Sequence, residues 1–375
     1  MQNEASPSSL SLRAPAWAEI LGRGASDAGS FALPSVEGRR VLVTGAGGFI
    51  GAEMVRRMAA AGAERLVMLE IAEQQLFAIH AEMEDRGAGE RSVAMLGSVC
   101  DRGLLASLFR EWQPELLLHA AALKHVPLME RNPLAALETN ALGTWRVAQA
   151  AAACGVEAMI LVSTDKAVAP HSIMGASKRI AELAMLAHAD GGGMRCAAVR
   201  LANVIGSPCS VGPLFLEQIG RGGPVTVTHP AARRYFLTLA DVAGLLGEAM
   251  RCDAAEGILV PDVGEPVFIE DLARRLIAAS GHTAQVVFTE LRPGDKLGES
   301  LVGPREQVDG AATPGLRRVS SPGADGLEPR MQTLEKAVAA RDLTAAMRVV
   351  EELAPDYQPS AVIRESIAEF SAAQP

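Results

Sequence analysis

Residues 40–51, Arg-Val-Leu-Val-Thr-Gly-Ala-Gly-Gly-Phe-Ile-Gly, decide the fold of this chain of 375 residues. The run Arg40–Thr44 is short, apolar and β-branched, which is typical of a buried parallel strand. The stretch after the glycines is amphipathic and has apolar side chains on one helical face, at Ile50, Met54, Val55 and Met58. The segment therefore predicts a strand, a glycine turn and a helix in direct succession.

The same alternation continues as far as residue 201. Further strand-like runs are Leu66–Leu69, Val93–Leu96, Leu116–His119, Met159–Ser163 and Ala197–Leu201. Helical runs separate them at Leu76–Asp85, Leu104–Trp112, Leu134–Ala153 and Ala176–Ala189. Strands separated by helices of this length predict an α/β fold, in which a doubly wound parallel (Rossmann) sheet is covered on both faces.

The three glycines Gly45, Gly48 and Gly51 have the spacing G-x-x-G-x-x-G between the first strand and helix. The first permits a tight turn, the second lets a pyrophosphate approach the backbone, and the third lets helix and strand pack closely. A second strand ends in Glu70, 19 residues after Gly51, where a carboxylate accepts from a ribose 2′-OH and repels a 2′-phosphate. The pattern predicts an NAD site. The alternative is a structural glycine turn with a surface glutamate.

Glycine and proline divide the chain into parts. Residues 1–38 are rich in Ser, Ala, Gly and Pro, with one helix candidate around Trp17–Leu21, and are predicted to be a leader or linker. Residues 39–206 would form the NAD-binding Rossmann domain. Residues 207–303 mix short strands and helices, which indicates a smaller mixed α/β substrate-binding lobe that exchanges segments with the Rossmann domain.

The last part of the chain, residues 304–375, is predicted to be a loop followed by helices. Gly and Pro are frequent over 304–330, so we expect no regular structure there. Helical patterns follow near 332–340, 343–353 and 361–371.

The overall composition excludes several functions. With 35 Lys+Arg against 44 Asp+Glu, a net charge of −9 and no dense basic tract, we expect neither nucleic acid nor an anionic membrane surface as a partner. The five cysteines are scattered and never spaced as C-x-x-C, which is typical of a cytoplasmic protein. No apolar run reaches the about 18 residues of a membrane span. No metal site is expected, because no acid or cysteine has metal-type spacing to His119, His125 or His229.

The fifth strand runs into Ser163-Thr164-Asp165-Lys166. Ligands of open parallel sheets bind at the carboxyl ends of the strands, so this hydroxyl, acid and amine would lie near the dinucleotide. The next helix begins with Met174 and brings a second cation, Lys178. An isolated Asp-Lys pair is usually a solvated turn, and only its place at a strand end after a cofactor motif favours catalysis.

Several longer segments carry a resemblance to a known family. The chain resembles the UDP-N-acetylglucosamine 4,6-dehydratases of bacterial polysaccharide biosynthesis, in the nucleotide-sugar branch of the extended short-chain dehydrogenase/reductase family. The resemblance covers residues 39–303. The matching segments are TGAGGFIG (44–51), HAAALKHVPLMERNP (119–133), ETNALGT (138–144), STDKAV (163–168), MGASKR (174–179), VRLANVIGS (199–207), GGPVTVTHP (222–230), RYF (234–236) and LRPGDKLGE (291–299).

The resemblance implies an NAD-dependent 4,6-dehydration of a UDP-N-acetylhexosamine, UDP-GlcNAc first among them. A hydride leaves C4, a base removes the C5 proton, the 6-hydroxyl leaves as water, and the hydride returns to C6. The product is a UDP-4-keto-6-deoxy sugar for surface glycan biosynthesis. The implied roles are the acid at O6 for Asp165, the base at C5 for Lys166, a hydrogen bond to O4 for Thr164, and contact with the nicotinamide ribose for Lys178.

The tyrosine that most of this superfamily uses is missing. The chain has only Tyr235 and Tyr357 and no Tyr-x-x-x-Lys, and Met174 stands four residues before Lys178. A methionine at this position places the resemblance within a methionine-bearing branch of the family. We hypothesise that Asp165, or a water held by Thr164 and Lys178, accepts the O4 proton instead.

Other binding residues follow from the resemblance. The cofactor set is Gly45, Gly48, Phe49, Ile50, Gly51, Glu70, Ser98, Val99, Ala120, Ala121, Lys124, Asn140 and Lys178. The substrate set is Lys124, His125, Asn203, Arg234 and Arg292. Six positions depart from the residues usual in the family: Phe49 (usually Ser), Ser98 (Asp), Leu123 (Tyr), Ala169 (Asn), Cys209 (Gly) and Gly298 (Tyr or another large residue).

Two other functions stay open. A sugar-nucleotide epimerase would use the same cofactor and ketone but return the hydride to C4. Asp165 and Lys166 favour dehydration, because epimerisation at C4 needs no acid at O6. A degenerate cofactor-binding regulator is disfavoured by the presence of Asp165, Lys166 and Lys178 together. The long apolar helices 134–153 and 176–189 favour a homo-oligomer.

Overall fold

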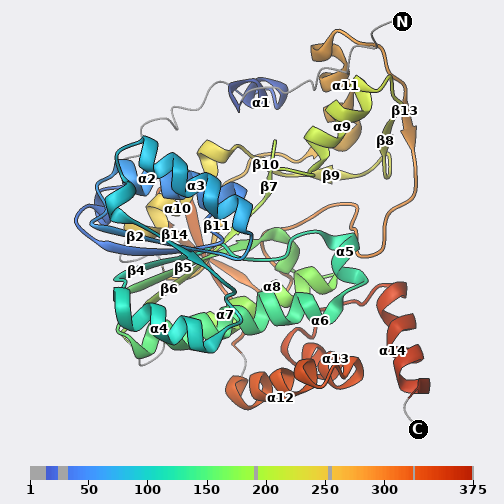
Figure 1. Cartoon of the computed structure of the whole chain (residues 1–375). Coiled ribbons are helices and arrows are strands. Elements are labelled where there is room, and N and C mark those ends of the chain that lie inside the picture. Colours follow the sequence, from blue (N-terminus) through green and yellow to red (C-terminus); the bar gives the residue numbers. More distant parts are fainter. Residues whose placement is uncertain (1–13, 24–32, 190–192, 252–255, 324–325, 374–375) are drawn as a thin grey trace, which may run out of the picture.

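A large sheet forms the centre of the computed structural model, which describes residues 14–23, 33–189, 193–251, 256–323 and 326–373 (Figure 1). Nine strands of this part of the chain form the sheet, in the order β14-β15-β11-β6-β5-β4-β1-β2-β3. Their bounds are β1 Arg40–Thr44, β2 Arg65–Glu70, β3 Ser92–Leu96, β4 Leu116–His119, β5 Ala158–Thr164, β6 Arg195–Leu201, β11 Gly257–Pro261, β14 Gln307–Thr313 and β15 Leu316–Ser320. All neighbouring strands from β3 to β11 pair in parallel. β15 pairs antiparallel with β11 on one side and with β14 on the other.

The parallel part has the strand order of a Rossmann fold. From β1 the chain runs outward through β2 to β3 and then returns to add β4, β5 and β6 on the other side. Helices cover both faces (Figure 1). One face carries α2 (Phe49–Ala60), α3 (Glu73–Asp85) and α10 (Leu239–Arg251), and the other carries α4 (Arg102–Trp112), α7 (Gly143–Ala153) and α8 (Ile173–Leu186). The predicted doubly wound α/β class is confirmed.

The strand register aligns the carboxyl ends of the central strands. Thr44, the last residue of β1, pairs with Leu69 of β2 and with His119 of β4, and His119 pairs with Leu161 of β5. The loops that follow these strands therefore leave the same edge of the sheet, where ligands bind in folds of this kind.

The predicted helix over 134–153 is continuous in the structure but is not uniform. It consists of α6 (Pro133–Ala136), a π-helical segment η4 (Leu137–Leu142) and α7. A short helix α5 (Val126–Glu130) precedes it, and short 3₁₀ helices lie at Pro34–Val36, Gly89–Arg91 and Asp165–Ala167. π-Helical turns are frequent at functional sites, and this one contains Asn140.

A smaller lobe lies beside the carboxyl edge of the sheet. It contains α9 (Val211–Gly220), α11 (Ile269–Ser280) and three two-stranded pairs: β7 with β10 (Asn203–Val204, Phe236–Leu237), β9 with β12 (Arg233–Arg234, Val267–Phe268) and β8 with β13 (Val225–Val227, Val286–Phe288). Two elements within the predicted lobe, residues 207–303, belong to the Rossmann half. β11 is a strand of the large sheet, and α10 is one of the helices that cover it. The helix α1 (Ala14–Ile20), in the predicted leader, packs on the lobe.

The prediction of a loop over 304–330 is wrong. Residues 307–320 form the hairpin β14–β15, which extends the large sheet beyond β11. Most of β14 is exposed, so it carries no apolar alternation that would reveal a strand. After the hairpin, the helices α12 (Leu327–Ala339) and α13 (Leu343–Leu353) pack beside α8, and α14 (Ala361–Ala373) follows. These three overlap the predicted C-terminal helices.

A buried group of charges joins the sheet to its surroundings. Arg200 of β6 is fully buried, and its guanidinium contacts Glu182 of α8 at 2.8 Å and Glu306 at 2.6 Å. Glu182 also accepts a hydrogen bond from Ser163 of β5 (2.6 Å) and pairs with Arg179 (3.0 Å). The Arg200 guanidinium lowers the pKa of Glu182 to about 2 despite its burial, so both charges are kept.

We predict that Arg200→Met strongly destabilises the fold. Removing Arg200 leaves the buried carboxylates of Glu182 and Glu306 with Arg179 alone as their cation, and breaking a buried pair in this way costs about 3–5 kcal/mol in similar cases. Urea denaturation followed by circular dichroism measures the change in free energy of unfolding. The matched control is Arg86→Met, which removes an exposed ion pair with Glu82 and should cost less than about 1 kcal/mol. Equal effects of the two substitutions would contradict the prediction.

Candidate active site

The glycine turn is shaped by close backbone contacts. Gly45 has φ +65°, and a Cβ atom there would lie 2.7 Å from the backbone nitrogen of Ala121. A Cβ at Gly51 would collide with the carbonyl oxygen of Gly45. Both positions therefore require glycine, and the turn is pressed against the start of the loop after β4.

The N-terminus of α2 opens at this turn. Gly48 is the N-cap residue and has no side chain that could accept a hydrogen bond. The backbone N–H groups of the first turn, at Phe49, Ile50 and Gly51, are therefore not capped by a side chain. A helix start of this kind is a site for phosphate, because its N–H groups and its dipole face the anion.

Glu70, predicted to contact a ribose, is buried and already bound to backbone. Its Oε2 accepts from the N–H of Gly47 (3.1 Å), and its Oε1 accepts from Ile71 (2.9 Å) and Ala72 (3.0 Å). A carboxylate has about four acceptor positions, so a ribose hydroxyl can still bind. The glutamate thus also holds the glycine turn, a role that the sequence motif did not reveal.

The other predicted cofactor residues lie in the loops after β3 and β4. Ser98 accepts through Oγ from the N–H of Cys100 (3.1 Å), and Val99 is buried beneath it. Ala120 donates its N–H to the carbonyl of Thr44 (3.1 Å), and Ala121 lies against Gly45. All four therefore border the same edge of the sheet as the glycine turn.

Asn140 of the π-helical segment is fully buried and braces the loop after β4. It accepts from the N–H of Leu123 (2.8 Å) and donates to the Leu123 carbonyl (3.0 Å) and to Ser177 Oγ of α8 (3.0 Å). The sequence-based assignment to the cofactor stays a prediction. In this structure Asn140 fixes the loop that carries Lys124 against the helix that carries Lys178.

His119 is a neutral structural histidine between two threonines. Its Nδ1 lies 2.6 Å from Thr44 Oγ1 and its Nε2 lies 3.0 Å from Thr144 Oγ1. Thr144 donates its own proton to the carbonyl of Asn140 (2.6 Å), so Nε2–H donates to Thr144 and Nδ1 accepts from Thr44. Burial, with a smaller effect of Lys178, lowers the pKa of His119 to about 3.

The residues at the end of β5 form a hydrogen-bonded cluster. Asp165 Oδ1 accepts from Thr164 Oγ1 (2.9 Å) and from Lys166 Nζ (2.9 Å), and Lys166 Nζ also donates to Asn203 Oδ1 (2.7 Å). The Asp165 side chain is fully buried, and its second oxygen, Oδ2, has no hydrogen-bond partner. A buried acceptor without a partner is costly, so a hydroxyl that donated to Oδ2 would relieve that cost.

The first turns of α8 lie beside this cluster. Lys178 donates to the carbonyl of Val162 in β5 (2.7 Å), and burial lowers the pKa of its ammonium to about 8. Met174 is buried among apolar side chains of α5, η4 and the C-terminal helices. Its thioether cannot exchange a proton, so the place of the absent tyrosine is filled by packing.

Lys124 and His125 lie on the loop after β4. Lys124 Nζ donates to the carbonyl of Pro208 (3.0 Å), and partial burial lowers its pKa. Partial burial, together with the nearby Lys124 charge, also lowers the pKa of His125. The segment 203–208 therefore contacts two predicted site residues, through Asn203 to Lys166 and through Pro208 to Lys124.

The two arginines of the predicted substrate set, Arg234 and Arg292, both form hydrogen bonds with residues 295–297 of one loop. Arg234 donates to the carbonyls of Leu297 (3.0 Å) and Lys296 (2.7 Å), and Arg292 is exposed and pairs with Asp295 (2.9 Å). Lys296 in turn donates to the carbonyl of Val168 (2.7 Å), two residues after Lys166. The structure thus connects the loop that contacts these arginines to the segment predicted to be catalytic.

Two residues of this arrangement were missed at the sequence level. Lys296 lies in the quoted segment 291–299, but its charge suggested no more than a surface lysine. Glu130 ends the segment Lys-His-Val-Pro-Leu-Met-Glu and is buried, where it accepts from the N–H of Ile173 (2.8 Å) and from Ser360 Oγ (2.5 Å). The sequence signal that could have identified Glu130 is an acidic residue at the end of an apolar helical turn.

Two of the departures from the family pattern have a backbone consequence. Ala169 has φ +37° and Cys209 has φ +59°, in the left-handed region that asparagine and glycine tolerate best. The resemblance implies that relatives usually carry asparagine at the first position and glycine at the second. The left-handed conformation costs about 1–2 kcal/mol for each residue with a Cβ.

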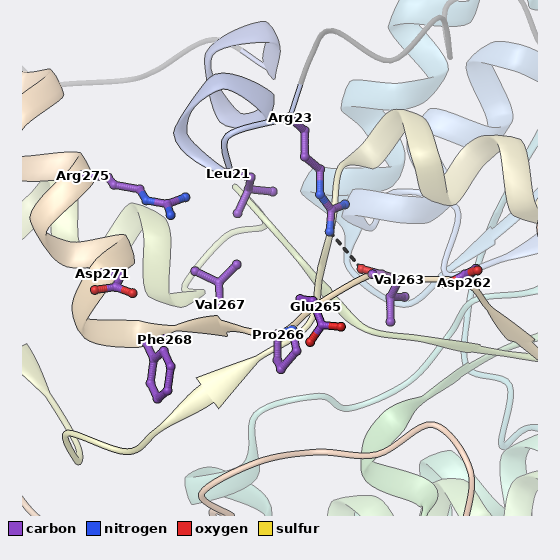
Figure 2. Close-up of a pocket in the computed structure, with 11 residues that line it drawn as sticks. Leu21, Arg23, Asp262, Val263, Glu265, Pro266, Val267, Phe268, Asp271 and Arg275 are labelled. Carbon is purple, nitrogen blue, oxygen red and sulfur yellow. Dashed lines mark hydrogen bonds between the residues drawn. The ribbon is translucent and has the colours of Figure 1, made fainter.

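A cavity of about 480 Å³ lies outside this cluster. Figure 2 shows residues that line it, which come from α11, from the segment 262–268 and from the residues just after α1. None of its lining residues belongs to the predicted site sets. Within the described ranges, no group of three or more His, Cys, Asp and Glu side chains could hold a metal ion. No helix in that part of the chain is long and apolar enough to cross a bilayer.

Relatives of known description match most of this chain. The chain is 43% identical over 276 residues to the probable polysaccharide biosynthesis protein EpsC of Bacillus subtilis (strain 168). It is 40% identical over 273 residues to the capsular polysaccharide biosynthesis protein CapD of Staphylococcus aureus. Each match covers 72% of this chain and 46% of the relative, so the chain spans about half the length of these proteins.

A solved structure and a family model complete the comparison. The structure is a DesIV double mutant, a dTDP-glucose 4,6-dehydratase from Streptomyces venezuelae with NAD and DAU bound. It has a TM-score of 0.63 and 26% identity, and the match covers 70% of this chain and 88% of that one. The model of the family described as polysaccharide biosynthesis protein matches residues 41–320. This chain therefore belongs to the polysaccharide biosynthesis protein family, within the extended short-chain dehydrogenases/reductases.

Proposed function

We propose that this chain catalyses the NAD-dependent 4,6-dehydration of a UDP-N-acetylhexosamine, with UDP-GlcNAc as the first candidate. The product would be a UDP-4-keto-6-deoxy-N-acetylhexosamine for bacterial surface glycan biosynthesis. One observation carries the proposal: Asp165 and Lys166 are bound to each other at the carboxyl end of β5, and Asp165 keeps a buried oxygen without a partner. An acid and an amine side by side are what dehydration needs and C4 epimerisation does not.

The residues around the glycine turn fit NAD. A Cβ at Gly45 or Gly51 would collide with neighbouring backbone atoms. The first turn of α2 has no side-chain cap, so its N–H groups can bind a pyrophosphate. Glu70 can still accept a hydrogen bond from a ribose hydroxyl. When bound, NAD supplies the acceptor and later the donor of a hydride. Lys178 of α8 reaches the carbonyl of Val162 in β5, and the resemblance places the nicotinamide ribose beside this lysine.

The substrate side is built from three segments that the structure connects. Lys124 lies on the loop after β4, Asn203 follows β6, and Arg234 and Arg292 meet at the loop 291–297. Guanidinium groups suit the oxygens of a diphosphate, because they offer paired donors. These four residues and His125 are the proposed contacts of the UDP-sugar.

The proton movements balance within the Asp165–Lys166 pair. The Asp165 carboxylate accepts the O4 proton through Oδ2 as the C4 hydride leaves, and later delivers that proton to O6, which departs as water. Lys166, acting as an amine, removes the C5 proton and returns it to C5 when the hydride is returned to C6. Both residues end in the protonation states in which they began.

The first prediction concerns the reaction. Incubation of the protein with UDP-GlcNAc and NAD should give a product lighter by one water, which mass spectrometry detects, with a C4 ketone and a C6 methyl group in the NMR spectrum. An epimerase would give a product of unchanged mass. Absence of a dehydrated product from every UDP-N-acetylhexosamine tried would contradict the proposal.

The second prediction concerns the missing tyrosine. Asp165→Asn should abolish C4 oxidation as well as dehydration, a loss of about 10²–10⁴-fold, because the amide cannot accept the O4 proton. Absorbance of the reduced nicotinamide in a single turnover follows C4 oxidation alone. The control is Asp85→Asn, an exposed acid at the end of α3, which should leave the rate unchanged. Normal C4 oxidation in the Asp165 variant would refute this role.

The third prediction concerns pH. Since burial lowers the pKa of Lys178 to about 8, its ammonium is lost as the pH rises above that value, and the kcat/KM of the free enzyme should fall there. In Lys178→Arg the cation persists above pH 12, so the alkaline decline should move to higher pH. An unchanged decline in this variant would assign it to another group.

A further inference from the structure

The helix α1 and the residues after it, Ala14–Arg23, are part of the lobe rather than a separate leader. Trp17, Ile20 and Leu21 are each less than a tenth exposed, and they share one apolar cluster with side chains of α9, β8 and α11. The sequence predicted a linker here, because Gly, Ser and Pro surround a single short apolar pattern.

Trp17 packs on two glycines of one segment. A Cβ at Gly206 would collide with the indole nitrogen, and a Cβ at Gly212 would lie 2.8 Å from Cη2 on the opposite edge of the ring. Gly206 also has φ +77°, a conformation that favours glycine. The indole therefore lies along the segment 206–212, with one edge against each glycine.

The same segment reaches the active site on its other side. Lys124 Nζ donates to the carbonyl of Pro208, and Asn203, three residues before Gly206, accepts from Lys166 Nζ. Residues 203–212 are thus held by two site lysines from within and by Trp17 from outside. A change in the packing of Trp17 would therefore alter the positions of Pro208 and Asn203.

Further contacts fix the end of the N-terminal segment. Arg275 of α11 donates to the carbonyl of Ile20 (3.1 Å). Arg23 donates to the carbonyl of Val263 (3.0 Å), the hydrogen bond that is dashed in Figure 2. Arg23 also lies 4.0 Å from Asp241 of α10. These contacts fix the N-terminal segment both to the lobe, at α11, and to the large sheet, at α10 and the residues after β11. None of these elements carries a part of the proposed NAD site.

We propose that Trp17 is a positioning residue for the sugar nucleotide. By packing on Gly206 and Gly212 it holds the segment 203–212 so that Lys124 and Asn203 meet the substrate, and it acts on substrate affinity rather than on NAD affinity. This inference rests on the proposed function for the identity of the substrate.

The test compares Trp17→Ala with Trp17→Phe and with the control Trp112→Ala, which removes a tryptophan at the end of α4, on the Rossmann half. In Trp17→Ala the KM for UDP-GlcNAc should rise about tenfold, while kcat changes less than about threefold and the Kd for NAD is unchanged. Trp17→Phe should recover most of the affinity. Equal losses for NAD and substrate in Trp17→Ala would overturn the proposal.

Hydrogen exchange gives a second readout that does not depend on turnover. In Trp17→Ala the amides of residues 203–212 should exchange faster, while those of α2 and α8 keep their rates. If the natural sequence turns over no UDP-sugar, the proposed function fails and this measurement alone decides the role of Trp17. Unchanged exchange over 203–212, or faster exchange throughout the chain in both Trp17 variants, would refute a positioning role.

Discussion

The fully buried ion pair between Arg200 and Glu182 is the interaction on which the active site depends. Arg200 lies on β6, Glu182 on α8 and Glu306 just before the hairpin, so one guanidinium joins three parts of the chain. Ser163 donates to Glu182 and directly precedes Thr164. Because a buried charge without its partner is so costly, these elements have few other arrangements open to them. The relative position of the end of β5 and α8 follows from this.

The site combines a rigid edge with adjustable loops. The parallel register brings the glycine turn, Glu70 and the end of β5 to one edge of the sheet, and these positions follow from backbone pairing alone. The groups that we propose for the sugar nucleotide lie instead on loops, and hydrogen bonds through Asn203, Pro208 and Val168 tie these loops to one another and to this edge. Such a division leaves the loops free to change without altering the sheet.

Much of the Rossmann half was predictable from the sequence, because the apolar pattern of each segment there matches the burial of that segment in the fold. Each strand up to β6 reads as an apolar run, and all of them except the edge strand β3 are largely buried on both faces. The hairpin 307–320 was not predicted, since β14 is exposed, although Pro314-Gly315 between its strands is a usual turn pair. The packing of Trp17 depends on glycines nearly 200 residues away in the sequence, and no local pattern reveals such a contact.

The two tyrosines do not replace the missing one. Tyr357 packs in the apolar cluster beyond α8, where burial, with added effects of Glu130 and Glu351, raises the pKa of its hydroxyl, so it is a poor proton acceptor at neutral pH. The backbone carbonyl of Tyr235 accepts a hydrogen bond from the N–H of Asn203, and its side chain packs against the main apolar core. Met174 closes the usual place with an apolar side chain. The group at the end of β5 that offers a buried and unpaired oxygen is Asp165, and its hydrogen bonds to Thr164 and Lys166 hold that oxygen in place. A carboxylate held in this way can do for O4 what the phenolate does elsewhere, because proton transfer requires a fixed acceptor within hydrogen-bonding distance and not a particular residue type.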